Sequence, residues 1–83
     1  PKFAIENLKV ISSNIVGEGH IKSIFAGKDG SVIKGIAFNA IDTPLEQFLN
    51  KNNKNKINIA GKMVANDWRG NRTIEFIIED ISL

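Results

Sequence analysis

The chain has 83 residues, which is the size of one small domain with one core. Cysteine is absent, so disulfides and most structural zinc sites are excluded, and we expect a reducing, cytoplasmic location. The net charge of +2 permits nucleic-acid binding but does not require it. No run approaches the roughly 18 apolar residues of a membrane span, and we expect no membrane contact.

Both ends of the chain run directly into predicted strands. The sequence opens on Pro1 without a methionine and closes at Leu83, directly after the last apolar alternation. We therefore expect residues 1–83 to form a single domain that has been excised from a longer, multidomain protein.

Three strands are predicted in the first half of the chain. Apolar residues alternate through residues 3–12, and the phase slips near Asn7, which indicates a bulge. Residues 20–26 and 31–38 form the next two strands, joined by a tight turn that ends in Asp-Gly. Gly35 interrupts the third strand, where glycine is typical of a bulge or a close backbone approach.

A short helix is predicted next. Thr43 is the expected N-cap, Pro44 stands at the first helical position, and Glu46 completes a capping box. One face of the helix carries the apolar residues Leu45, Phe48 and Leu49. The polar run at residues 50–55 ends the helix and is predicted to be a solvated connector.

The last third of the chain is predicted to form a hairpin. Residues 57–65 and 72–81 alternate with period two, and residues 66–71 form a polar turn between them. Trp68, the only tryptophan, lies in this turn beside Arg69. Two interpretations of its ring stay open. It is either exposed and stacks on a nucleic-acid base, which we favour, or it folds back as a plug of the barrel end.

This order of elements defines an all-β fold. Three strands, a short helix and two further strands, all read as short and antiparallel, predict a five-stranded Greek-key OB-fold barrel with a short helix between strands three and four. Such a barrel binds ligands with strands two and three and with the loops that join strands 1–2 and 4–5. Four aromatic residues are expected in core positions: Phe25, Phe38, Phe48 and Phe76.

Catalytic chemistry finds little support in the sequence. The single histidine, His20, has no carboxylate and nucleophile around it, so we expect it to hydrogen-bond the loop backbone or, as the alternative, to touch a phosphate. Glu79 and Asp80 are adjacent in a strand and point to opposite faces, which indicates surface charge. We expect no catalysis and no metal or other cofactor in this domain.

Basic residues fall where an OB barrel presents its binding surface. Lys22 and Lys34 point outward from the second and third strands. Only one exposed aromatic residue is expected, whereas strong single-strand binders carry several, so we expect an auxiliary binding surface. The candidate nucleic-acid-binding residues are His20, Lys22, Lys34, Lys62, Trp68, Arg69 and Arg72.

Four short motifs together resemble the OB-fold domain of the bacterial RecJ exonuclease family. In chain order they are GEGHIK at 17–22, GIAFN at 35–39, NDWRG at 66–70 and IEDI at 78–81. They span nearly the whole chain. Ser23 departs from the pattern because the family usually has an apolar residue there, and we expect slight underpacking of the core around it. The positions that match the family motifs are His20, Lys22, Phe38, Asn66, Trp68 and Gly70.

The resemblance implies a parent enzyme that degrades single-stranded DNA from its 5′ end in DNA repair and recombination. It also implies two manganese or magnesium ions held by separate DHH-type catalytic domains. No Asp-His-His triplet occurs in residues 1–83, so no metal ligand is carried over. The implied partners are single-stranded DNA, the catalytic domains of the same chain and, as a further candidate, single-stranded-DNA-binding protein.

Two functions therefore stay open for this domain. In the first, it binds single-stranded DNA through basic residues and a stacked base. In the second, it docks on the catalytic domains through outward apolar residues such as Ile24, Val64 and Ile77, with little DNA contact. An RNA-binding OB module fits the fold but not the four motifs.

Overall fold

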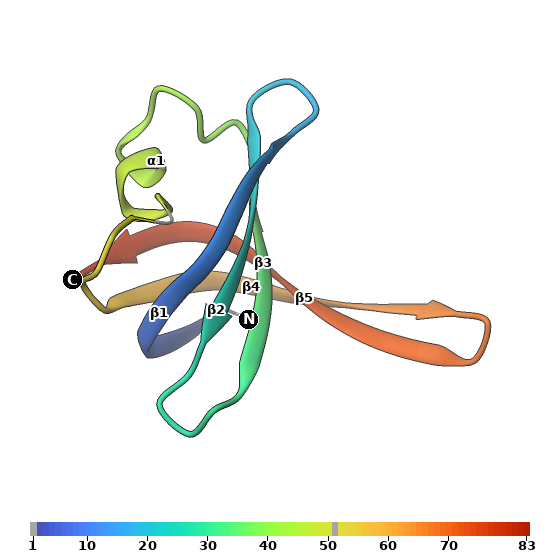
Figure 1. The fold of residues 1–83 in the computed structure, drawn as a ribbon. Coiled ribbons are helices and arrows are strands. Elements are labelled where there is room, and N and C mark those ends of the chain that lie inside the picture. The colour runs from blue at the N-terminus through green and yellow to red at the C-terminus, as the bar shows by residue number, and fades with distance from the viewer. Residues whose placement is uncertain (1, 51) are drawn as a thin grey trace.

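We describe the chain from a computed structural model, which covers residues 2–50 and 52–83 except for the side chains of residues 66, 68, 72 and 73. Five strands close into a barrel in the order β1-β2-β3-β5-β4 (Figure 1). The predicted OB-fold is confirmed, with the helix between the third and fourth strands. In the described part of the chain, no helix is long and apolar enough to cross a membrane. The elements are β1 (Phe3–Val16), β2 (His20–Ala26), β3 (Val32–Ala37), α1 (Pro44–Phe48), β4 (Ile57–Trp68) and β5 (Asn71–Ser82).

The prediction that all strands are short and antiparallel is wrong. β3 lies parallel to β5, with Gly35 opposite Phe76 and Ile36 opposite Ile77. β1 has 14 residues, and β4 and β5 have 12 each. β1 is long because it pairs with β4 through its first half and with β2 through its second half, whereas β4 and β5 are long because they pair with each other as far as Trp68 and Asn71.

Two bulges bend β1 between these partners. The predicted phase slip near Asn7 is confirmed, since the β1–β4 register shifts between Ile5 and Leu8. Asn7 has a φ of 58°, and its backbone N–H donates to the Asn58 Oδ1 at 3.0 Å. A second shift separates Val10 from Ser12 on the β2 side. Bulges of this kind let a single strand serve both sides of a small barrel.

Gly35 permits a close approach and does not form a bulge. The β2–β3 register runs through it without a shift. A Cβ at this position would lie 3.0 Å from the Cδ1 of Ile78 and 3.2 Å from the Cε2 of Phe25, so core side chains fill the space. The core is apolar and draws on every strand: Leu8, Val10, Ile21, Phe25, Ala37, Ile57, Ile59, Phe76, Ile78 and Ile81.

The helix begins at Pro44 as predicted, but the predicted capping box is wrong. Thr43 makes no side-chain cap; its hydroxyl donates to the Ala40 carbonyl at 2.6 Å. The Glu46 carboxylate accepts from the N–H of Asp42 at 2.9 Å, one residue earlier than a capping box requires. The reason is a turn before the helix, where Asp42 has a φ of 63° and Thr43 N–H bonds back to Ala40. Loss of the Thr43 hydroxyl is therefore not expected to uncap the helix.

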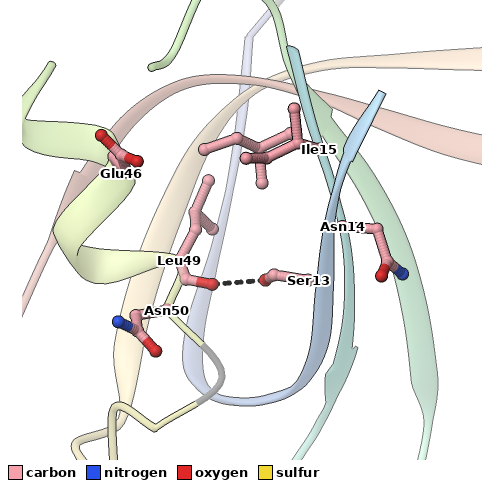
Figure 2. A pocket seen from close by; sticks show the side chains of 7 residues that line it. Ser13, Asn14, Ile15, Glu46, Leu49 and Asn50 are labelled. Atoms are coloured by element: carbon pink, nitrogen blue, oxygen red, sulfur yellow. Dashed lines mark hydrogen bonds between the residues drawn. The ribbon is translucent and has the colours of Figure 1, made fainter. Parts of the chain in front are cut away.

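A buried pair of serines joins the helix end to the barrel. Ser23 is 2% exposed, and its hydroxyl lies 2.7 Å from that of Ser13 on β1. The Ser13 hydroxyl donates to the Leu49 carbonyl just after α1 (Figure 2). Since Ser13 has one hydroxyl hydrogen, Ser23 must be the donor between the two serines. The predicted slight underpacking at Ser23 stays a prediction, and the structure shows that this buried serine has its hydroxyl hydrogen-bonded.

Replacing Ser13 by alanine is expected to destabilise the domain by about 1–3 kcal/mol, because it leaves the Ser23 hydroxyl and the Leu49 carbonyl without partners. Ser23→Ala is expected to cost less, because the Ser13 hydroxyl still donates to the Leu49 carbonyl and loses only the hydrogen bond that it accepts from Ser23. Urea unfolding of both variants tests the order, and a larger loss in Ser23→Ala would contradict the assigned direction of donation.

The β4–β5 hairpin continues past the barrel as an arm (Figure 1). Its turn is only Arg69-Gly70, with φ values of 50° and 80°, so the predicted turn at 66–71 is too long. Two positive φ values suit the tight turn whose twist matches long paired strands. Met63 and Ile74 continue the core alternation, yet they are 45% and 59% exposed because no other strand covers the arm.

Candidate nucleic-acid interface

The outer face of β1, β2 and β3 brings together three of the seven candidate residues: His20, Lys22 and Lys34. Cross-strand pairing forms rows on this face: Asn14 lies opposite Lys22, and Lys22 opposite Ile36. The next row joins Ser12, Ile24 and Lys34. The row at the other end joins Val16 and His20, with Phe38 beside the histidine. We call these nine residues the outer face.

Phe38 is exposed, and its predicted place in the core is wrong. Its neighbour Ala37 is fully buried, so alternation turns Phe38 outward at the end of β3, where it is 51% exposed. Ile36 shares this face but is buried, since Ile77 of β5 lies opposite it. Parity with the outward Lys34 is the sequence signal that favours an outward Phe38, but the buried Ile36 has the same parity, so this signal alone does not decide it.

His20 fixes the position of this phenylalanine. Its Nδ1 accepts from the backbone N–H of Asn39 at 3.0 Å, which assigns the ring hydrogen to Nε2. The imidazole and Phe38 rings meet edge to face, with centroids 5.3 Å apart and an angle of 76°. His20 therefore does hydrogen-bond a backbone group, but the predicted partner is wrong, because the donor follows β3 and does not belong to the loop before His20.

A backbone clamp holds the same end of the barrel together. The carbonyl of Gly19 accepts from the N–H groups of Ala40 at 2.8 Å and Ile41 at 3.2 Å. Gly17, with a φ of 59°, packs against the imidazole, since a Cβ there would lie 3.2 Å from the His20 Cδ2. These hydrogen bonds join the loop between β1 and β2 to the segment after β3, and they hold the backbone next to Phe38 in place.

A groove of about 220 Å³ lies on the outer face over the rows of Lys22 and Lys34. Lys22 and Lys34 line it together with Glu75 of β5, and the Lys22 Nζ lies 3.8 Å from a Glu75 carboxylate oxygen. Among the described residues no carboxylate lies within ion-pair distance of Lys34. The outward position predicted for both lysines is confirmed, since both are exposed. The groove is therefore basic with one acidic side chain.

A second groove, of about 230 Å³, lies between α1 and the strands β1 and β2 (Figure 2). Its lining is mostly neutral, with Glu46 as its charged residue among the described side chains: Ser13, Asn14, Ile15, Ile21, Glu46, Leu49 and Asn50. Because a polyanion needs positive charge, this groove is a poorer nucleic-acid site than the outer face.

The remaining candidates lie away from the two lysines. Lys62 on β4 lies opposite Ile77, two strands beyond Ile36, and its ammonium is 3.9 Å from Glu79. A hydrogen bond from Lys2 lowers the pKa of Glu79, and the charges of Lys2 and Lys62 act in the same direction.

Arg69 lies in the turn at the far end of the hairpin arm. The side chains of Trp68 and Arg72 are outside the described residues, so their DNA contacts stay predictions.

Acidic and histidine side chains do not gather into a metal site on this domain. Within residues 2–50 and 52–83, no group of three His, Asp or Glu side chains lies close enough to hold an ion. The described residues therefore do not fit the manganese or magnesium of the implied parent enzyme.

The barrel and its outer face define an OB-fold domain. Residues 1–80 match the RecJ OB domain family, and the chain belongs to that family. It is 33% identical over 76 residues to the single-stranded-DNA-specific exonuclease RecJ of Escherichia coli K12, and 35% identical over 74 residues to that of Salmonella typhimurium. These regions cover 90% and 88% of this chain but only 12% of each relative.

Two solved structures share the fold. Both are crystal forms of Rim1, the mitochondrial single-stranded DNA binding protein of S. cerevisiae, with TM-scores of 0.66 and 0.61. The matches cover 100% and 98% of this chain and 91% and 89% of the yeast chains. Sequence identity is 18% and 16%, so the likeness concerns the fold.

Proposed function

We propose that this domain binds single-stranded DNA as a non-catalytic module of a RecJ-like 5′→3′ exonuclease of the bacterial cytoplasm. Membership of the RecJ OB family and the activity in the names of the two bacterial relatives support the assignment. In the proposed parent, catalytic DHH-type domains hold manganese or magnesium and act in DNA repair and recombination. Single-stranded-DNA-binding protein is a further proposed partner.

One observation carries the proposal: the outer face carries an exposed aromatic ring, Phe38, in the row beside that of Lys22, and Lys34 lies one row further along. Phe38 offers a flat surface for a base, and base–aromatic stacking tolerates any sequence. Lys22 and Lys34 lie in neighbouring rows of the same face, on β2 and β3, the strands with which an OB barrel binds its ligands. Trp68 and Arg69 would extend the surface along the hairpin arm, as the sequence predicts.

Docking on the catalytic domains is the second candidate function. Of the apolar residues predicted for docking, Val64 is exposed, whereas Ile24 and Ile77 are half-buried. Met63 and Ile74, which are apolar and exposed on the hairpin arm, favour docking more strongly than the half-buried Ile24 and Ile77 do. Docking through Met63 and Ile74 leaves Lys22, Lys34 and Phe38 accessible to DNA, so the two functions are compatible in one domain, although both would use the arm if Trp68 and Arg69 also contact DNA.

Binding of a single-stranded oligonucleotide is expected to weaken steeply with salt. Each phosphate contact contributes about −0.7 to the log–log slope, so about four or five contacts from the predicted lysines and arginines give an expected wild-type slope of roughly −3. Lys22→Ala with Lys34→Ala should make the slope shallower by about 1.4. Fluorescence anisotropy between low and physiological salt measures both values.

A matched control removes two lysines that lie off the outer face. Lys28 is in the β2–β3 turn and Lys54 in the connector after α1, and both are exposed. Lys28→Ala with Lys54→Ala changes the net charge equally but should leave the slope near the wild-type value. Equal slopes for the two double variants would reject the outer face as the DNA site.

A further inference from the structure

Glu75 is the one acidic side chain among the described residues that line the groove on the outer face. It lies on β5, and the parallel pairing of Gly35 with Phe76 brings this strand beside β3. Its side chain is 28% exposed, and that of Lys22 is 56% exposed. The carboxylate therefore stands at the wall of the groove, and the ammonium reaches further into solvent.

The Lys22–Glu75 distance of 3.8 Å sets up a competition. A carboxylate and a DNA phosphate are both anions that use the same ammonium hydrogens. A phosphate that approaches Lys22 must displace Glu75 or lie beside its negative charge. Lys34, which lines the same groove, has no such competitor among the described side chains, so the two lysines are unequal before any ligand arrives.

We propose that Glu75 is an internal competitor of the DNA phosphate for Lys22 and limits how tightly the outer face holds a single strand. The inference rests on the proposed function and adds a residue that opposes it. A module that feeds DNA through a larger enzyme has to release each nucleotide, and a competing carboxylate shortens the lifetime of a phosphate contact without removing the contact.

Glu75→Gln keeps the shape of the side chain and removes its charge. The variant is expected to bind a dT oligonucleotide about three- to tenfold more tightly than wild type at low salt, because an exposed ion pair and a nearby like charge are both removed. The control is Glu6→Gln, which removes the same charge from an exposed position in the first half of β1, off the outer face. It should tighten binding by less than twofold.

A double-variant cycle separates competition for Lys22 from a general charge effect. In a Lys22→Ala background, Glu75→Gln should tighten binding no more than Glu6→Gln does. Circular dichroism on each variant checks that the barrel is intact. The proposal is overturned if Glu75→Gln and Glu6→Gln act alike in the wild-type background, or if the gain persists in full without Lys22.

Base composition provides a second readout. If Glu75 read a base instead, as a carboxylate accepting from the amino group of cytosine, Glu75→Gln would weaken binding to a dC oligonucleotide and spare dT. That result would overturn the proposal, whereas equal tightening on both supports it. The proposed function fails separately, if the wild-type domain binds neither oligonucleotide in a salt-dependent way.

Discussion

Gly61→Ala is expected to destabilise the domain by at least about 3 kcal/mol, a large share of the roughly 4–12 kcal/mol typical of an 83-residue domain. A Cβ at Gly61 would overlap the carbonyl oxygen of Ile77 and lie 3.0 Å from its carbonyl carbon and 3.1 Å from the amide nitrogen of Glu79. These atoms are backbone, so no rotamer change relieves the overlap. One of the two strands would have to move.

The cause is a register shift in the β4–β5 pair between Ala60 and Gly61. The shift places an extra residue, Glu79, on β5 and brings the two backbones together at the glycine. Denaturant unfolding followed by circular dichroism measures the loss. The same experiment on a glycine without close neighbours gives the reference.

Gly30→Ala is that reference. Gly30 lies in the β2–β3 turn with a φ of 85°, and no atom lies within 4 Å of its Cβ position. Alanine there should cost only about 1 kcal/mol, the strain of a left-handed backbone. If Gly61→Ala were no worse than Gly30→Ala, the close approach of β4 and β5 would be contradicted.

The sequence predicts the barrel well because strand alternation and element order are local signals. The bulge at Asn7 and the close packing at Gly35 both follow from a break in a period-two pattern. The bulge opposite Gly61 leaves the same kind of break, because the buried residues Ile78 and Ile81 are three positions apart with Glu79 and Asp80 between them. The close approach at Gly61 itself leaves no such signal, because Gly61 fits the alternation of β4 and the approach depends on how β5 pairs with it.

The candidate site was predictable only where it depends on one strand. Period two places Lys22 and Lys34 outward, and the structure agrees. The contact of Lys22 with Glu75 joins residues far apart in sequence through a parallel pairing that the sequence did not indicate. The exposure of Phe38 depends on where the β3–β5 pairing ends. Ile36 has the same parity, but it pairs with Ile77 of β5 and is buried.

Phe38→Ala is expected to lower the affinity for single-stranded DNA by about 1–3 kcal/mol, or roughly five- to 150-fold, the usual loss for one stacked base. The unfolding midpoint should change little, since about half of the side chain is exposed and its main ring contact is with His20. Phe38→Trp should retain or strengthen binding because the larger ring still stacks. Anisotropy titration and urea unfolding on the same samples separate affinity from stability.

Phe3→Ala is the matched control. Phe3 is also exposed, at 44%, but it lies at the start of β1 opposite Gly61 and off the outer face. It should leave DNA affinity unchanged. Equal losses in Phe3→Ala and Phe38→Ala would show that the ring of Phe38 has no specific role. A loss of stability in Phe38→Ala with unchanged affinity would make the His20–Phe38 pair a structural lock at the end of β3, and DNA would then have to bind elsewhere, with the hairpin arm that carries Trp68 as the next surface to test.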